Sequence, residues 1–304
     1  MRHYLLSFIM IIPATVLAID CTKTTSEAEK TICNNLSIQR LDAILNKAYQ
    51  DKIKVVDKKA LKDKQISWLK EREKCSNDVF CLSDKYISRI AELTNLKNIS
   101  IINNSSKDFD FLLTASNCKQ EDKGTSCEGD ALLNIFQKNK PNLIQSLPIE
   151  KVTIGFNQLY LDKKIFTTTP EDTEFSLKDI NFDGREDVIL HKDNEGGYMS
   201  PTYHVYLYNP SKDKFFNSRE LTELLSDSYG DFDIDGKSKT ITTNGKDGYA
   251  WRQKSTWKIE KNKPVLVKQI TEEDEKNGEN TIVTIKEMVN GKWKESTTKK
   301  KIEQ

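Results

Sequence analysis

Residues 179–187 place oxygen-bearing side chains at the spacing of a calcium-binding loop. The first, third, fifth and ninth positions are Asp179, Asn181, Asp183 and Asp187. Calcium takes roughly six to eight oxygen ligands, and alternate residues of a tight loop can supply them when a glycine makes the sharp turn. Gly184 stands at the sixth position, and Arg185 at the seventh would contribute only its backbone carbonyl. We therefore predict a Ca²⁺ site here, with a metal-free Asp/Asn/Gly turn as the alternative.

The predicted metal loop should join strands and not helices. An EF-hand loop ends in a bidentate glutamate at its twelfth position, where this chain has Leu190. Short apolar runs lie on both sides of the loop, at residues 175–177 and 188–190, and such runs are typical of strands. The calcium site is therefore expected in a β-domain.

The first eighteen residues have the pattern of an export signal. Arg2 precedes an apolar run over residues 5–12, and residues 16–18 fit a small-residue cleavage site. The mature chain should begin at Ile19 as a periplasmic protein without a membrane anchor, because an acidic residue before Cys21 disfavours lipid attachment. Loss of Arg2 changes the 47 basic and 46 acidic residues of the full chain to 46 of each. A neutral chain argues against nucleic acid as a partner.

Apolar side chains recur at steps of three and four over residues 26–96, which predicts amphipathic helices. Leu41, Ile44 and Ala48 show this spacing, as do Tyr86, Ile90 and Leu93 in a later stretch. We expect a helical domain over residues 19–97, a polar linker over 98–110 and a β-domain over 111–304. The second and third helices should lie antiparallel.

Six cysteines, all beyond residue 18, should form disulfides in an oxidising compartment. Cys118 and Cys127 are expected to pair locally. An antiparallel helix pair would bring Cys33 close to Cys75, so we favour bridges from Cys21 or Cys33 to Cys75 or Cys81 over a local Cys75–Cys81 bond. Both non-local schemes stay open. Zinc is disfavoured, because no Cys-x2-Cys pair or nearby histidine is present.

Beyond the linker, short apolar runs alternate with turn residues. They fall at residues 152–154, 203–208, 240–242, 255–259, 265–270 and 281–285. Runs of this length and spacing predict an antiparallel all-β domain, either a sandwich or a propeller-like arrangement. The whole chain is therefore expected to be an α+β multidomain protein, with a small disulfide-bonded helical domain followed by this β-domain.

The helical segment carries a specific pattern of residues. It runs Asp20-Cys21, Ile32-Cys33, Leu41-Asp42, Tyr49, Gln65-x-x-Trp68-Leu69-x-x-Arg72-x-x-Cys75, then Cys81-Leu82-x-x-x-Tyr86-x-x-Arg89-Ile90. This pattern resembles the LprI-type lysozyme-inhibitor family of small exported helical domains. The resemblance covers about a quarter of the chain.

The β-domain is similar to a second family. Its metal loop, Gly196-Gly197-Tyr198 and the run from Tyr203 to Pro210 resemble calcium-binding β-domains of bacterial periplasms that inhibit peptidoglycan hydrolases, including immunity proteins against secretion-system toxins. The resemblance spans roughly residues 108–295. The segment between Asp187 and Tyr203, where an inhibitory loop should lie, matches only loosely.

A candidate inhibitory loop lies between two predicted strands and has two glycines at its crest. It comprises Asn194, Glu195, Gly196, Gly197, Tyr198 and Met199, together with Tyr203. A narrow projection with an aromatic hydroxyl group could occupy a sugar subsite of a lysozyme and bond to a catalytic carboxyl. A solvent-exposed β-loop without this role is the alternative.

Both resemblances imply a non-catalytic protein whose partner is a lysozyme-like peptidoglycan hydrolase. A calcium-stabilised module that binds glycan or a surface partner is the alternative function. An enzyme is the third, although His191 and His204 lie on predicted strands without a paired nucleophile in any known catalytic motif.

Overall fold

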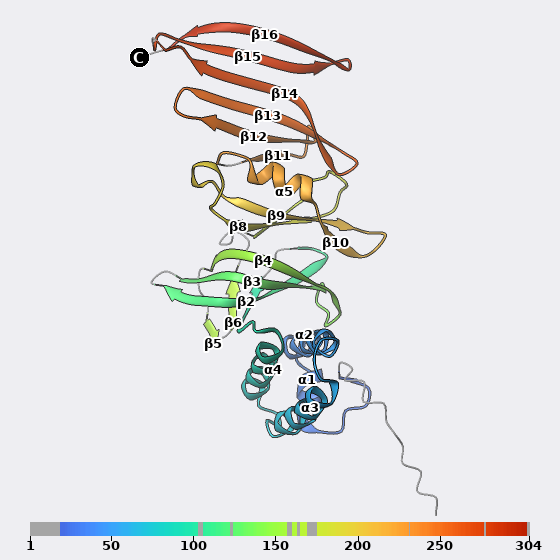
Figure 1. Cartoon of the computed structure of the whole chain (residues 1–304). Helices are drawn as coiled ribbons and strands as arrows, with labels where there is room; N and C mark the ends of the chain where they lie inside the picture. The colour runs from blue at the N-terminus through green and yellow to red at the C-terminus, as the bar shows by residue number, and fades with distance from the viewer. Residues whose placement is uncertain are drawn as a thin grey trace, which may run out of the picture. The chain divides into compact units, whose positions relative to one another are not determined.

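The computed structural model describes residues 19–102, 106–121, 124–156, 160–162, 165–168, 175–230, 232–276 and 278–302. The chain divides into two compact units, with the boundary between Thr94 and Asn95 (Figure 1). The first unit is helical and the second consists mainly of strands.

The helical unit contains α1 (Glu27–Cys33), α2 (Leu36–Lys52), α3 (Lys58–Glu73) and α4 (Val79–Thr94). Polar side chains cap the starts of the first three. Ser26 and Glu29 form a capping box on α1, Asn35 accepts the amide of Ile38, and Asp57 accepts that of Ala60. Such caps satisfy backbone N–H groups that have no partner within the helix. The helices predicted from the apolar spacing are confirmed.

The core of the helical unit forms where α2 packs against α4. Ile38 and Ile44 of α2 and Leu82 and Ile90 of α4 are each at most 2% exposed. Truncating one such side chain to alanine would cost about 2–5 kcal/mol. By contrast, α3 buries only Leu61, Gln65 and Arg72, so two of its three buried residues are polar.

Two of the three disulfides differ from the predicted pairing. The helical unit contains the local bonds Cys21–Cys33 and Cys75–Cys81 in place of the predicted non-local bridges. Tight turns explain both. The amide of Lys23 donates to the carbonyl of Asp20, which turns the chain before α1. Asp78 accepts the amides of Phe80 and Cys81 at the start of α4. Each turn brings its two Cα atoms to 5.5 Å, so the non-local schemes are wrong.

The predicted Cys118–Cys127 bond is confirmed, and it joins directly opposite residues of two neighbouring strands, β2 (Phe109–Glu121) and β3 (Gly124–Gln137).

The second unit holds three sheets among its described residues. The first contains β1 (Asn98–Ile102), β2 (Phe109–Glu121), β3 (Gly124–Gln137), β4 (Leu143–Phe156), β5 (Tyr160–Asp162) and β6 (Ile165–Thr168), in the order β4-β3-β2-β1-β6-β5. The second contains β7 (Phe175–Lys178), β8 (Asp187–Asp193), β9 (Thr202–Asn209) and β10 (Lys214–Asn217), in the order β10-β9-β8-β7. After α5 (Arg219–Ser226) come β11 (Asp233–Asp235), β12 (Thr240–Asp247), β13 (Trp251–Glu260), β14 (Lys263–Asp274), β15 (Asn280–Val289) and β16 (Lys292–Lys301), which pair in sequence order.

The described pairings are antiparallel except for β1 with β6, which agrees with the predicted antiparallel β-domain. The strand β1 differs from the predicted polar linker over residues 98–110. It pairs with β2 on one side and β6 on the other, so neighbouring backbones satisfy its amides despite Asn98 and Ser100, which are poor strand formers. Residues 103–105 of the predicted linker lie outside the described part.

Apolar side chains on both faces of β8 hold the second sheet in the core. Val188 and Leu190 join the cluster that includes Phe111 of β2, whereas Ile189 joins the cluster that includes Leu221 of α5. This alternation follows from the two-residue repeat of a strand.

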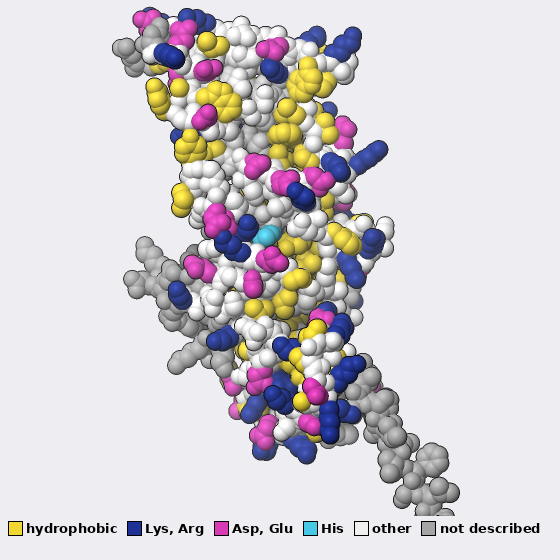
Figure 2. Space-filling model, in the orientation of Figure 1, with side chains coloured by type: hydrophobic (Ala, Val, Ile, Leu, Met, Phe, Trp, Pro, Cys, Tyr) yellow, Lys and Arg dark blue, Asp and Glu magenta, His cyan; other side chains and the backbone are white. Residues whose placement is uncertain are grey.

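The third sheet ends in a polar edge, because every residue of β16 from Lys292 to Lys301 is exposed. Figure 2 shows basic and acidic side chains interspersed on the face that it presents, as the near-zero net charge leads one to expect. Lysines along an edge strand hinder pairing with another chain. Within the described residues, we find no helix long and apolar enough to cross a membrane.

Candidate functional site

The helical unit contains a buried polar network between α2, α3 and α4. The hydroxyl of Tyr86 donates to Asp42 Oδ1 at 2.8 Å, and Arg72 Nη1 donates to the Tyr86 hydroxyl oxygen at 3.3 Å. The second carboxylate oxygen of Asp42 accepts the backbone N–H of Ile19 at 2.8 Å. Burial raises the pKa of Asp42, whereas the hydrogen bonds from Ile19 and Tyr86 act in the opposite direction. All three side chains are at most 7% exposed.

A second set of contacts fixes α3 against α4. Arg89 donates to Gln65 Oε1 at 3.0 Å, and the indole N–H of Trp68 donates to the carbonyl of Lys85 at 3.2 Å. The rings of Trp68 and Tyr86 meet edge to face at 5.2 Å between centroids, with the Arg72 guanidinium 5.8 Å from the Trp68 ring. Gln65, Trp68 and Arg72, which share a helix face, thus each have a partner on α4, although Gln65 is bonded only through its oxygen.

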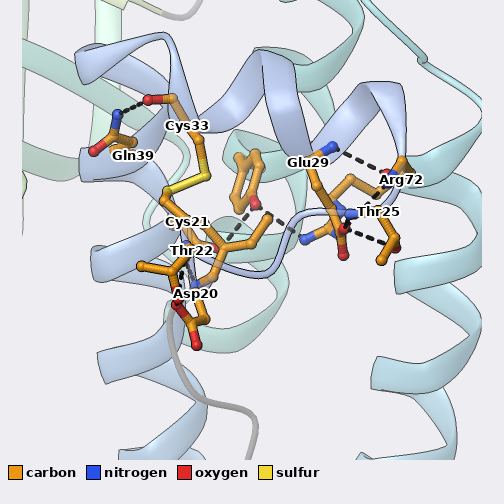
Figure 3. The surroundings of a disulfide bond; sticks show 12 residues. Asp20, Cys21, Thr22, Thr25, Glu29, Cys33, Gln39 and Arg72 are labelled. Carbon is orange, nitrogen blue, oxygen red and sulfur yellow. Dashed lines mark hydrogen bonds between the residues drawn. A yellow bond between two sulfur atoms is a disulfide. The ribbon is translucent and has the colours of Figure 1, made fainter.

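A groove of about 690 Å³ opens beside this network. Figure 3 shows two of the residues that line it, Glu29 of α1 and Arg72 of α3, close to the Cys21–Cys33 disulfide. Among the described residues, three buried atoms of lining side chains lack a hydrogen-bond partner: Asn46 Oδ1, Gln65 Nε2 and Glu73 Oε2. Buried polar atoms are normally satisfied, so this groove is suited to receive water or polar groups of a partner.

Exposed residues of α3 form the rim of the groove. Lys62, Ile66 and Lys70 follow at steps of four along α3, line the groove and are exposed; we name them the α3 stripe. Ile66 is 43% exposed, which is unusual for a large apolar residue between two lysines. The stripe combines an apolar anchor with positive charge.

The predicted metal loop lies between β7 and β8, as the flanking apolar runs predicted. Asp179 accepts the amides of Asp183 and Gly184 at 2.9 and 2.8 Å. Phe182 and Gly184 adopt left-handed backbone angles, with φ of 62° and 87°, which curls the loop.

The side chains of the loop also bond to one another and to the neighbouring backbone. Asn181 donates to Asp183 Oδ2 at 3.1 Å, and Asp187 accepts the amides of Ile180 and Tyr208 at 3.1 and 2.9 Å. Burial raises the pKa of Asp187 to about 7, against the effect of these two amides. The Arg185 side chain is half exposed and lies 3.8 Å from Asp108.

No group of three or more acidic, histidine or cysteine side chains is placed to hold a metal in the described part of the chain. The loop's carboxylates nevertheless keep acceptor capacity, because each carboxylate offers about four lone-pair sites. The calcium site stays a prediction.

The candidate inhibitory loop forms a short 3-10 turn, Gly197–Met199, between β8 and β9. Tyr198 and Met199 both adopt left-handed angles and are 59% and 77% exposed. A Cβ at Gly196 would lie 2.6 Å from the carbonyl oxygen of Ser200, so this position requires glycine. The strained backbone at Tyr198 and Met199 places the Met199 side chain at the surface.

Tyr198 is anchored by residues of β12, of the turn after it and of the segment between α5 and β11. Its hydroxyl accepts the amide of Gly248 at 2.7 Å, and its ring meets that of Tyr229 edge to face at 5.6 Å. The Lys246 ammonium lies 5.6 and 4.8 Å from the centroids of these two rings. Sequence reasoning missed Tyr229 and Lys246, because no periodicity or motif links them to the loop.

The other predicted loop residues hold the base of the turn. Asn194 contacts His191 Nε2 at 3.1 Å, and Glu195 pairs with Lys151. Tyr203 is half buried and packs against Phe232 with ring centroids 5.2 Å apart. Tyr203 therefore belongs to the packed interior at the base of the loop.

Comparison with known proteins assigns a class to the helical unit: residues 21–97 match the family described as "Lysozyme inhibitor LprI". An LprI-type domain thus forms the first part of the chain. Individual relatives include the lipoproteins LprI of Mycobacterium bovis and of Mycobacterium tuberculosis strain H37Rv, each 29% identical over 84 residues. The match covers 27% of this chain and 43% of each relative, so it spans less than half of their length.

A solved structure described as a Xanthomonas type IV secretion system related protein is also similar. It has 22% sequence identity and a TM-score of 0.48, and the match covers 65% of this chain and 96% of that chain.

Proposed function

We propose that this protein is an exported, non-catalytic inhibitor that binds and blocks a lysozyme-like peptidoglycan hydrolase. The match of residues 21–97 to the lysozyme-inhibitor family carries this proposal. The residues of the family-like pattern, among them Asp42, Arg72 and Tyr86, are joined in one buried network, which gives the helical unit a rigid frame. A rigid frame lowers the ordering cost of binding.

We infer that the α3 stripe is the contact surface of the helical unit. The helix α3 carries five lysines against three carboxylates. A lysozyme cleft contains catalytic carboxyl groups, so a positive helix face is complementary to it and should speed association. Ile66, which is exposed in this structure, would supply the apolar anchor that the hydrolase buries.

Export is part of this proposal. The relatives are named lipoproteins. For this chain we propose instead that residues 1–18 are removed and that the mature protein, starting at Ile19, acts in the periplasm without a lipid anchor. Mass spectrometry of the protein isolated from periplasm would test the position of cleavage.

The β unit supports a second candidate, a glycan- or surface-binding module. The exposed rings of Tyr198 and Tyr229 with Lys246 form an aromatic surface of the kind that stacks on sugars or on a protein partner. The same loop is the candidate inhibitory loop. If it contacts the hydrolase, Tyr198→Ala weakens the inhibition by the full chain; if it binds glycan, the variant loses cell-wall binding and still inhibits.

A turbidity assay on purified cell walls separates these functions. An inhibitor leaves the walls intact when added alone and slows their clearing by an added lysozyme in proportion to its concentration. A wall-binding module sediments with the walls and leaves clearing by lysozyme unchanged. Clearing of the walls by the protein alone would show that it is an enzyme.

A further inference from the structure

The backbone nitrogen of Ile19 lies 2.8 Å from Asp42 Oδ2, where it donates a hydrogen bond to a carboxylate that is only 7% exposed. Asp42 Oδ1 is occupied by the Tyr86 hydroxyl at 2.8 Å. Both oxygens of this carboxylate are thus directed to defined donors. One donor is the residue that the sequence predicts as the first of the mature chain.

The charge of Asp42 is incompletely balanced. No lysine or arginine is seen in an ion pair with it across the described residues. Arg72 is linked to it by hydrogen bonds only through the Tyr86 hydroxyl, although its charge also acts on Asp42, and the same guanidinium pairs with Glu73 at 2.5 Å. Four carboxylates and three lysine or arginine side chains line the adjoining groove. A buried carboxylate without a cation in direct contact is costly, so this site favours one further positive charge.

We propose that cleavage after Ala18 converts the Ile19 nitrogen into an α-ammonium that forms an ion pair with Asp42, so that processing completes the buried network of the helical unit. The cleavage is hydrolysis by a signal-removing peptidase. Water supplies the hydroxyl to the Ala18 carbonyl and a hydrogen to the Ile19 nitrogen, and the resulting amine takes up a proton from solvent. An α-amino group has a pKa of about 7.7–8.0, so it is mostly protonated at neutral pH.

The turn after Ile19 fixes the position of the new terminus. Asp20 Oδ1 accepts the amide of Thr22 at 3.1 Å, and the Asp20 carbonyl accepts the amide of Lys23 at 2.9 Å. The disulfide from Cys21 to Cys33 ties this turn to α1 (Figure 3). One extra residue would move the charged nitrogen along the chain by up to about 3.8 Å, beyond ion-pair contact with Asp42. The inference rests on cleavage after Ala18 and is independent of the proposed inhibition.

Thermal unfolding of two forms of the full mature chain tests the proposal. One form begins at Ile19, and the other retains Ala18; each is released from a fusion by a protease that leaves no other residue. Helix loss is followed by circular dichroism at neutral pH. We expect the form that begins at Ile19 to unfold at least about 4 °C higher. Asp42→Asn should abolish this difference, and the matched control Asp63→Asn on the exposed face of α3 should preserve it.

If Asp42→Asn does not fold, a second measurement tests the ion pair between the Ile19 α-ammonium and Asp42. Only the neutral amine is acylated, and the ion pair with Asp42 keeps the Ile19 α-amino group protonated. This group should therefore react with an amine-acylating reagent about tenfold more slowly than the α-amino group of the Ala18 form, which corresponds to a pKa higher by about one unit. Mass spectrometry of N-terminal peptides measures both rates. Equal rates together with equal unfolding temperatures would overturn the proposal, as would a temperature difference that persists in Asp42→Asn. Each of these outcomes leaves the proposed inhibition untouched.

Discussion

At the scale of single residues, Asp193 at the end of β8 illustrates how hydrogen bonds control a carboxylate. Burial acts to raise its pKa, but the Thr202 hydroxyl at 2.5 Å, the Glu195 amide at 3.0 Å and Lys151 hold the pKa well below the usual value of 3.8. A depressed folded-state pKa contributes stability that is present above the unfolded-state value and is lost as the pH falls through the folded-state value.

Asp193→Asn should therefore destabilise the β unit by roughly 1–3 kcal/mol at pH 7, because charge-assisted hydrogen bonds are lost. Below pH 3.8 the difference from wild type should shrink progressively, because the Asp193 carboxyl of the unfolded chain takes up a proton while that of the folded state stays ionised to lower pH. Denaturant unfolding at pH 7 and at pH 2.5 would measure both values. A difference of the same size at both pH values would contradict this account of Asp193.

The predicted calcium site also depends on a few individual side chains. If Asp179, Asn181, Asp183 and Asp187 bind calcium in the folded state alone, calcium raises the melting temperature of the β unit. Added chelator should lower it in wild type and have no effect in Asp183→Ala. An unchanged melting temperature in calcium, in chelator and in the variant would establish the loop as the metal-free turn that its backbone hydrogen bonds already describe.

At the scale of elements, the local disulfides alter the expected response to reduction. Cys75–Cys81 spans six residues and Cys21–Cys33 spans twelve. Loops of this size should each contribute about 2–3 kcal/mol, less than a non-local bridge would. Replacing Cys75 and Cys81 by serine should lower the stability of the helical unit by that amount and spare the β unit, while serine at Cys118 and Cys127 should do the reverse. Helix and sheet signals followed separately during unfolding would test this, and loss of both units in either variant would refute it.

The α3 stripe gives a second prediction at this scale. Lys62→Glu with Lys70→Glu reverses two exposed charges beside Ile66, so association with a lysozyme should slow by at least about tenfold at low salt. Lys300→Glu with Lys301→Glu makes the same charge change on β16 and serves as the matched control. Association rates from a surface-binding assay, repeated at high salt, would report the effect. Equal rates for both variants would exclude the α3 stripe as the contact.

Most of the helices and strands could be predicted from the sequence, because the spacing of apolar residues shows which face of an element is buried. The helices followed from the spacing of residues such as Leu41, Ile44 and Tyr86, and the strands beside the 179–187 loop from their β-branched runs. The pairing predicted for the four cysteines of the helical unit was wrong, because the turns at Asp20 and Asp78 that bring the true partners together depend on side-chain-to-backbone hydrogen bonds, which apolar spacing does not reveal. The strand β1 was missed because its polar residues Asn98 and Ser100 gave no strand pattern, and because one of its two partners, β6, is distant in sequence.

The candidate site could be predicted only in part. The pattern shared with the lysozyme inhibitors identified Gln65, Trp68 and Arg72. In the structure Trp68 and Arg72 contact Tyr86, which bonds to Asp42, whereas Gln65 accepts a hydrogen bond from Arg89. The contact of the Ile19 nitrogen with Asp42 has no sequence signal, because a backbone donor carries no residue preference. The aromatic neighbours of Tyr198 likewise emerge only when the second and third sheets are assembled.

At the scale of the whole molecule, two units of different architecture lie in one chain, and we propose one contact surface on each. The α3 stripe belongs to the unit that matches the lysozyme inhibitors, and the Tyr198 loop belongs to the β unit. Two such surfaces could engage one hydrolase together, and the linkage would then raise the affinity through effective concentration. A chain cut between the units should in that case bind more weakly than the intact protein.

If the protein obstructs the active site of a lysozyme-like hydrolase, as we propose, it must compete with ligands that bind in the cleft. The mature chain would be titrated calorimetrically into a lysozyme, first alone and then with its sugar subsites saturated by a chitooligosaccharide. Obstruction predicts binding to the free enzyme and an apparent affinity that falls in proportion to the sugar concentration. Binding of the same strength with the cleft filled, or no binding to any lysozyme tested, would contradict the claim.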